Sequence, residues 1–397
     1  MKEIVIASAA RTAVGSFGGA LKDTPPCDLA TTAAKAAIER AGIAADQIEQ
    51  AFFGNVIHTE PRDMYLSRVA SRQAGVPDHA PALTMNRLCG SGLQAVVSAV
   101  QAISMGDGET ALVGGAENMS RAGYQLPGAR WGQKMGDTGI VDMMIGALHD
   151  PFGIGHMGVT AENVAERYDI SRERQDEFAV ESHRRASAAI QGGHFTAQII
   201  PLTVGRRGKE RVFDTDEHVR HEAKLDDMSG LRPVFKKDGM VTAGNASGLN
   251  DGAAALILAS ADKASELGLQ PLARIRSYGV AGVDPAVMGI GPVPAMQIAM
   301  KRAGVTADDL DVVESNEAFA AQACAVNDLL GLASEKVNPN GGAVALGHPI
   351  GATGAILMTK LVHELHRTGK TLGAATMCIG GGQGSAVVVE SLSGGNS

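Results

Sequence analysis

The sequence is poor in aromatic side chains and in cysteine. Aromatic residues make up 4% of the 397 residues, with a single tryptophan, so the core has to be built from aliphatic side chains. Four cysteines in a chain of this length exclude the disulfide framework that stabilises small secreted domains. We therefore expect free thiols and a reducing, cytoplasmic location.

Excess positive charge and long apolar runs are also missing. The formal net charge is −8, without the basic footprint of a nucleic-acid-binding protein, and we expect no nucleic-acid partner. The first residues include Glu3 and no long apolar region, so no signal peptide is predicted. Residues 341–359 form an uncharged stretch, but glycines, His348 and Pro349 interrupt it, and we expect no membrane span.

Glycine is abundant, at 50 residues, and several glycines lie in segments that occur twice. Arg40 and Arg302 each begin an Arg-Ala-Gly segment that follows an alanine-rich stretch and precedes an apolar run. At nearly the same separation, Cys89 and His348 each open a glycine-containing turn into a stretch with helical character, and these stretches are expected to end at Gly106 and Gly369. This self-similarity predicts two related α/β halves, each mixing strands and helices.

The separation between matching segments falls by about half further along the chain. Gly252 and Gly384 begin similar apolar runs, so the first half carries an insertion between about Asn118 and Asn250. The predicted domains are residues 1–118 with 248–268, an inserted loop domain over 119–247, and a second half over 269–393. Within the insertion, residues 160–191 have helical periodicity, with Ser171 as a candidate cap.

The insertion also concentrates positive charge. Arginine and lysine crowd residues 206–224 of an otherwise acidic chain. Two interpretations stay open for this basic segment: a solvated loop, or a local site for a phosphorylated ligand.

Cys89 has the surroundings of a reactive thiol. It follows an apolar, strand-like stretch and precedes Gly-Ser-Gly, where glycine permits a sharp turn from strand to helix. A thiol that faces the positive end of a helix has a lowered pKa and is nucleophilic. A buried structural cysteine is the alternative interpretation.

Three further residues could work with Cys89. His348 stands in Gly-His-Pro, where Pro349 fits the first turn of a helix, and by the internal repeat it lies opposite Cys89, as a base lies opposite its nucleophile. Cys378 shortly precedes three glycines, whose N–H groups could bind an oxyanion. Asn316 follows a strand-like run and can hold a water or a carbonyl. A zinc site is disfavoured because no Cys-x-x-Cys spacing exists.

These residues together carry a recognisable pattern. The sequence resembles the thiolases, and within them the bacterial acetyl-CoA acetyltransferases, or β-ketothiolases. The matching segments are spread over nearly the whole chain and are residues 86–92, 243–248, 316–319, 341–349 and 378–382.

The resemblance implies an α/β fold of five layers, αβαβα, built from two similar halves with an inserted loop domain. It implies an acyltransferase of the acetyl-CoA C-acetyltransferase type, which joins two acetyl-CoA molecules into acetoacetyl-CoA and cleaves 3-ketoacyl-CoA with CoA. A broad-range 3-ketoacyl-CoA thiolase of β-oxidation is the alternative. Coenzyme A and acyl-CoA enter as substrates, with no permanently bound cofactor and no metal. The direction, towards polyhydroxybutyrate synthesis or fatty-acid degradation, stays open.

The resemblance also assigns roles to the candidate residues. Cys89 would carry the acyl group and His348 would take its proton. Cys378 would remove the α-proton of acetyl-CoA, while His348 and a water held by Asn316 would stabilise the enolate. The backbone N–H groups of Cys89 and Gly380 would form the oxyanion hole for the acylated cysteine.

The CoA contacts and the assembly follow from the same resemblance. Ser247 would hydrogen-bond the pantetheine, Arg220 with the basic segment would meet the ADP part, and Met288 would bound the acyl pocket. The tunnel would be lined by Leu148, His156, Met157, Phe235, Ala243, Ala318 and Phe319, with plain packing as the alternative for the apolar ones. A homotetramer of two dimers is implied, joined through residues 125–141, which include the single tryptophan.

Two rival functions are weaker. A decarboxylating ketoacyl synthase shares the fold and a cysteine nucleophile. Such enzymes carry a Cys-His-His set of catalytic residues, whereas this chain supplies Asn316, His348 and Cys378. A catalytically silent lipid-binding relative is disfavoured because both Cys89 and Cys378 are present.

Overall fold

The computed structural model describes residues 2–392, and their main sheet is mixed and bends into two layers, beside two separate two-stranded sheets. The strand order is β13-β14-β15-β12-β1-β11-β5-β3-β4. The two layers are joined where β1 and β12 pair over only two positions, Val5 with Arg274 and Ile6 with Ala273. The first layer contains β1 (Ile4–Thr12), β3 (Gln50–Gly54), β4 (Ala82–Met85), β5 (Thr110–Asn118) and β11 (Asn250–Ser260); the second contains β12 (Ala273–Gly282), β13 (Val312–Ser315), β14 (Leu372–Ile379) and β15 (Gln383–Ser391).

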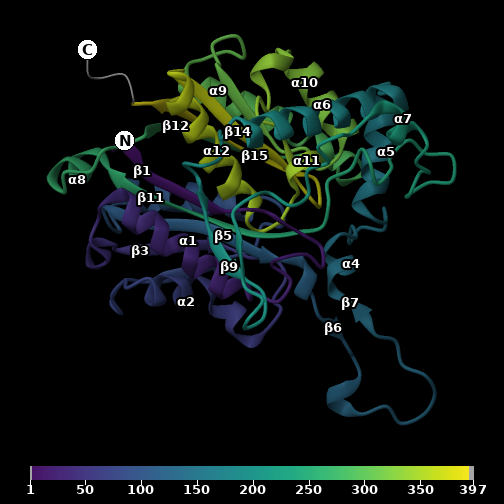
Figure 1. Ribbon diagram of the computed structural model, residues 1–397, viewed down its shortest axis with the longest axis horizontal. Helices are drawn as coiled ribbons and strands as arrows, with labels where there is room; N and C mark the ends of the chain where they lie inside the picture. Colours follow the sequence, from purple (N-terminus) through teal and green to yellow (C-terminus); the bar gives the residue numbers. More distant parts are fainter. Residues whose placement is uncertain (1, 393–397) are drawn as a thin grey trace.

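Helices cover both outer faces and fill the space between the two sheet layers (Figure 1). The outer helices are α1 (Pro26–Ala41) and α2 (Leu66–Gln73) on the first layer and α9 (Pro292–Ala303) and α10 (Ala320–Leu330) on the second, and the middle helices are α3 (Ser91–Met105) and α12 (Thr353–Thr368). This arrangement is the αβαβα order that the resemblance implies, and the α/β fold of two similar halves is confirmed.

The two middle helices need glycine to pack this closely. A Cβ on Gly92 would lie 2.8 Å from the backbone nitrogen of Ala355, and a Cβ on Gly354 would lie 2.1 Å from that of Leu93. Any side chain at either glycine would push α3 and α12 apart. The contact is near the first turn of each helix, so it also brings together the two loops that precede them.

Helix ends follow the predicted glycines. Gly106 ends α3 and Gly369 ends α12, each in the left-handed conformation that glycine adopts without strain. The segment Leu88–Met105 is long and apolar enough to cross a membrane on length and composition alone. Its helix α3 instead packs against β3, β5 and α12, so its hydrophobicity is that of a core helix.

The predicted long helix of the insertion is two helices. Asp169 has φ of +54° and separates α5 (Met157–Arg167) from α6 (Arg172–Gln191), and Ser171 caps α6 by accepting from the backbone N–H of Arg174. Both helices pack against α10 of the second half. The shorter inserted elements are β6 (Tyr124–Gln125), β7 (Val141–Asp142), α4 (Met143–Ala147), β8 (Ile199–Ile200), β9 (Leu202–Val204), β10 (Arg211–Phe213) and α7 (Leu225–Ser229).

Part of the insertion leaves the body of the molecule. The chain between β6 and β7 extends as an arm away from both sheet layers (Figure 1). Its large apolar side chains are exposed, Trp131 by 84% and Met135 by 90%. In contrast, β8 pairs in parallel with β1, so the insertion also adds a strand to the central sheet.

Candidate active site

Cys89 lies on a strained turn between β4 and α3. Leu88 has φ of +47°, a left-handed conformation that is unfavourable for a side chain branched at Cγ. The turn is held by Ser91, whose hydroxyl accepts from the backbone N–H of Arg87 at 2.8 Å and donates to the carbonyl of Leu88 at 2.6 Å. The side chain of Asn86 accepts from the N–H of Leu88 at 2.8 Å. Strain of this kind, held by its surroundings, is typical of functional turns.

The pKa of Cys89 differs from the prediction. Burial raises it to about 11, and the buried carboxylate of Glu117 adds to the rise. The backbone N–H groups of Gly380 and of Cys89 itself lower it, but by less than burial raises it. The expectation of a lowered pKa at the helix end was therefore wrong, because desolvation outweighs the favourable backbone groups. The resting group is a thiol that needs a base.

His348 is held in the form that can act as that base. Its Nδ1 lies 2.7 Å from the hydroxyl of Thr353, and that hydroxyl donates to the carbonyl of Pro349 at 2.9 Å. Since the single hydroxyl hydrogen is committed to Pro349, Nδ1 must donate to Thr353, and Nε2 carries the free lone pair. Burial lowers the pKa of His348 to about 4, so the ring is neutral near pH 7.

The sequence predicts that His348 stands at the start of a helix, but the structure places it in a loop before the helix. The helix α12 begins at Thr353. The preceding turn is diverted into the first half of the molecule, where the N–H of Gly351 donates to Glu117 at 2.9 Å. The backbone N–H of His348 donates to the side chain of Asn250 at 2.9 Å. His348 is thus fixed by contacts to the first half as well as by its own hydrogen bonds.

Asn316 and Cys378 come from adjacent parallel strands of the second layer. Asn316 follows β13, its N–H donates to the carbonyl of Thr376, and its side-chain Nδ2 lies 3.5 Å from Nε2 of His348. Cys378 lies near the end of β14. Burial, and then the neighbouring Cys89, raise its pKa. A second protonated thiol therefore lies close to the first.

One cavity of about 250 Å³ connects these groups. Its walls are mostly apolar, and His156 stacks on Phe235 with ring centroids 4.7 Å apart. The predicted residues on its walls are Cys89, His348, Cys378, Leu148, His156, Met157, Phe235, Ala243, Ser247, Met288, Ala318 and Phe319. Two further predicted groups contact these residues rather than the cavity: Asn316 through His348, and Gly380 through the sulfur of Cys89.

Sequence reasoning missed several wall residues. They are Met119, Val234, Thr242, Ala246, Gly248, Leu249 and Ile350. Ala246 and Gly248 lie within the matching segment 243–248, and the others except Met119 lie next to a predicted residue or a matching segment, which was their only signal. Met119, which follows β5, had none.

Arg220 is a further predicted site residue that does not line the cavity. Its side chain is exposed, and its backbone N–H donates to Nδ1 of His183 at 3.1 Å. Two residues earlier, His218 packs over Gly248, where an added Cβ would lie 2.5 Å from the imidazole. The segment therefore adjoins Ser247 and the cavity, while the guanidinium lies outside it.

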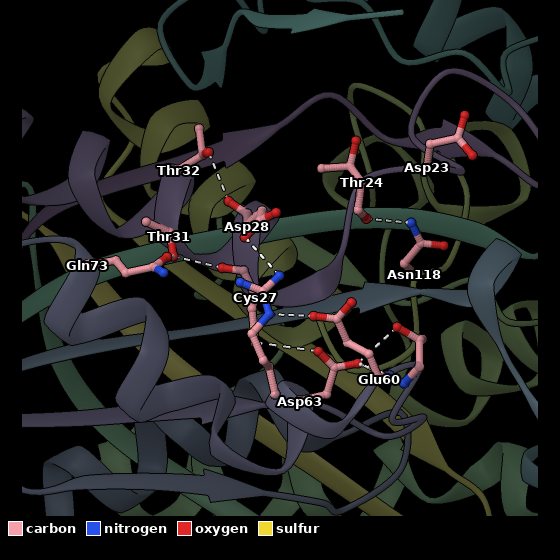
Figure 2. A network of polar contacts seen from close by, with 12 residues as sticks. Asp23, Thr24, Cys27, Asp28, Thr31, Thr32, Glu60, Asp63, Gln73 and Asn118 are labelled. Carbon is pink, nitrogen blue, oxygen red and sulfur yellow. Dashed lines mark hydrogen bonds and ion pairs between the residues drawn. The ribbon is translucent and has the colours of Figure 1, made fainter. Parts of the chain in front are cut away.

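The other two cysteines have structural surroundings. Cys27 on α1 donates to Asp63 at 3.4 Å, and Asp63 also accepts from the backbone N–H of Glu60 (Figure 2). The same carboxylate accepts from Thr59. Burial and this carboxylate raise the pKa of Cys27 to about 12. Cys324 on α10 is buried, and its pKa is also raised to about 12. Of the four free cysteines, only Cys89 and Cys378 reach the cavity.

Comparison with known proteins agrees with this fold and site. The model of the thiolase N-terminal domain matches residues 4–262, and that of the thiolase C-terminal domain matches residues 269–391. The fold and the relatives described below define an acyltransferase of the thiolase type. The chain belongs to the thiolase family.

Similar proteins align over almost their full length. β-Ketothiolase BktB of Cupriavidus necator is 60% identical over 98% of this chain and 100% of its own, and an acetyl-CoA acetyltransferase of the same organism is 53% identical with the same coverage. The structure of human mitochondrial 3-ketoacyl-CoA thiolase has a TM-score of 0.96 at 44% identity, covering 98% of this chain and 99% of its own. That of Bacillus anthracis acetyl-CoA acetyltransferase has 0.96 at 47%, covering 99% of each.

Proposed function

We propose that this thiolase joins two acetyl-CoA molecules into acetoacetyl-CoA and CoA, reversibly, and cleaves 3-ketoacyl-CoA with CoA. One observation carries the proposal: two protonated thiols and a neutral histidine meet around one apolar cavity. Condensation needs a nucleophile that is also a leaving group, and a separate base for the α-proton. The names of the similar acetyl-CoA acetyltransferases and β-ketothiolase support the substrate class.

In the first step, Nε2 of His348 takes the proton of Cys89 and the sulfur attacks the thioester carbonyl of acetyl-CoA. The negative charge develops on the carbonyl oxygen, and preorganised N–H groups stabilise it. The N–H groups of Gly380 and Cys89, which already point at the sulfur, are the candidate donors. Collapse of the intermediate expels CoA, which takes the proton from His348, and leaves an acetyl group on Cys89.

In the second step, Cys378 acts on a second acetyl-CoA. Nε2 of His348, neutral again after CoA has left, takes the proton of Cys378. The resulting thiolate removes an α-proton, and the charge moves to the thioester oxygen as an enolate. The protonated His348 and a water held by Asn316 stabilise that oxygen. The α-carbon attacks the acetyl group on Cys89, which forms the new carbon–carbon bond and releases the Cys89 thiolate, and this thiolate takes the proton from His348.

A broad-range 3-ketoacyl-CoA thiolase is the second candidate. The 60% identity to a β-ketothiolase and the fold similarity to a 3-ketoacyl-CoA thiolase favour it. A short-chain enzyme and a broad-range thiolase differ in how far the acyl end of the cavity extends. Met288, which is buried on the cavity wall, is our candidate for the residue that closes it.

The remaining assignments are proposals of the same kind. Ser247 binds the pantetheine, and Arg220 with the basic segment contacts the ADP part beyond the cavity. The domains are 1–118 with 248–268, the insertion 119–247, and 269–393. The exposed apolar arm over 125–141 joins dimers into a homotetramer, and four free thiols fit the cytoplasm. The physiological role is polyhydroxybutyrate synthesis or fatty-acid metabolism.

The test is an assay of acetoacetyl-CoA cleavage by CoA, run beside malonyl-dependent condensation. We expect cleavage of acetoacetyl-CoA and no malonyl-dependent condensation. A decarboxylating ketoacyl synthase would catalyse the condensation and not the cleavage. Radiolabelled acetyl-CoA should leave acetyl on the wild type and none on Cys89→Ser. Label retained by that variant would move the nucleophile to another residue.

A further inference from the structure

A buried ion pair lies beside a small cavity that Asn316 also lines. Lys360 of α12 donates to Glu314 of β13 at 2.6 Å and to the carbonyl of Gly341 at 2.7 Å. The side chains of Lys360 and Glu314 are only 3% and 0% exposed. An ammonium this deeply buried is costly unless each of its N–H groups has a partner.

One N–H group of Lys360 and the side-chain oxygen of Asn316 have no hydrogen-bond partner among the described residues. An ammonium has three protons, and two are accounted for by Glu314 and Gly341. The side-chain Oδ1 of Asn316 is buried and accepts no hydrogen bond from the described residues. Both residues line the same cavity of about 20 Å³, all of whose lining residues are buried. That volume holds about one water molecule.

The orientation of the Asn316 amide follows from the histidine. Because Nε2 of His348 is the unprotonated nitrogen, the amide has to present Nδ2 towards it, as the 3.5 Å contact shows. Oδ1 is then on the opposite side of the amide and needs a donor there. Two cations line the small cavity. Arg11 already directs four of its five N–H groups at Gln198, Thr12 and Asp216, and the ammonium of Lys360 has one of its three N–H groups available to supply the donor.

We propose that Lys360 is a positioning residue for Asn316, acting through one bound water. The ammonium donates to this water, and the water donates to Oδ1 of Asn316. This chain keeps Nδ2 directed at the reaction site, and a hydrogen bond on Oδ1 makes the Nδ2–H a stronger donor. Glu314 balances the charge of Lys360. The inference rests on the proposed function, in which Asn316 stabilises the enolate.

The proposal makes the enolate step sensitive to Lys360 and leaves acylation of Cys89 unaffected. Lys360→Met keeps an unbranched side chain, one atom shorter than that of lysine, but removes the donor. We expect it to slow exchange of the acetyl α-protons of acetyl-CoA with solvent by about tenfold, which corresponds to the loss of one hydrogen bond. The rate of acetyl transfer to Cys89 should change less than twofold. An equal fall in both rates would overturn the proposal.

Two variants separate the donor from the ion pair. Glu314→Gln removes the negative charge but leaves the ammonium, and its exchange should stay within twofold of the wild type. The double variant Glu314→Gln with Lys360→Met leaves no unpaired charge, so it should fold even if Lys360→Met does not, and it should still exchange slowly. If Glu314→Gln alone slows exchange as much as the double variant, the ion pair is responsible and the proposal fails.

A double-mutant cycle with Asn316→Ala gives the final test. If Lys360 acts through Asn316, the Lys360 substitution should change exchange less than twofold once Asn316 is alanine. An unchanged tenfold effect in that background would refute the link. Failure of the proposed function gives a different result, because the wild type itself would then not cleave acetoacetyl-CoA.

Discussion

Replacing Met288 by alanine tests what closes the acyl end of the cavity. Met288 is 2% exposed and packs in one cluster with Met157, Phe319 and Cys378. Its flexible thioether fits an irregular gap. Truncating a fully buried methionine costs about 2–5 kcal/mol of folding free energy, and here it would also enlarge the space beside the second thiol.

The expected gain for longer substrates follows from the apolar area that they bury. A six-carbon 3-ketoacyl-CoA has two methylenes more than a four-carbon one. Each methylene that reaches an apolar wall is worth about 0.8 kcal/mol. Two of them give about 1.6 kcal/mol, or a shift of roughly 15-fold in the ratio of the two kcat/KM values.

The assay measures kcat/KM for both substrates and the thermal midpoint of each protein. Met296→Ala is the matched control, because Met296 is also fully buried but lies in a different cluster, on α9. It should lower the midpoint and leave the substrate ratio unchanged. If Met288→Ala behaves in the same way, Met288 is an ordinary core residue and the pocket assignment is wrong.

Three other properties can be checked directly. Cys89 should be a thiol at neutral pH, since its pKa is raised to about 11; thiolate absorbance should therefore match that of Cys89→Ala near pH 7, and an excess there would contradict the assignment. Cys378→Ser should still take acetyl label at Cys89 but lose α-proton exchange with solvent, and normal exchange would remove Cys378 as the base. Deleting the arm over residues 125–141, where Trp131 is 84% exposed, should reduce a tetramer to dimers in light scattering, and an intact tetramer would place the contact elsewhere.

Local features of the sequence determined much of the fold. The duplicated segments predicted two α/β halves, and Gly106 and Gly369 ended the two middle helices where expected. Ser171 capped α6 as predicted. Such signals can be read from the sequence because backbone conformation at a helix end depends on neighbouring residues. The motif residues Cys89 and His348 were found in the same way.

Only the tertiary structure decided how the site residues behave. The pKa of Cys89 is raised and not lowered, because desolvation depends on groups from both halves of the chain. Burial in the folded protein keeps His348 neutral, and its loop is drawn aside by Glu117, over 200 residues away in sequence. Likewise, no sequence pattern placed Lys360 beside the small cavity that Asn316 lines. Contacts between residues far apart in the chain set the charge and orientation of each group, and these exist only once the two halves have packed.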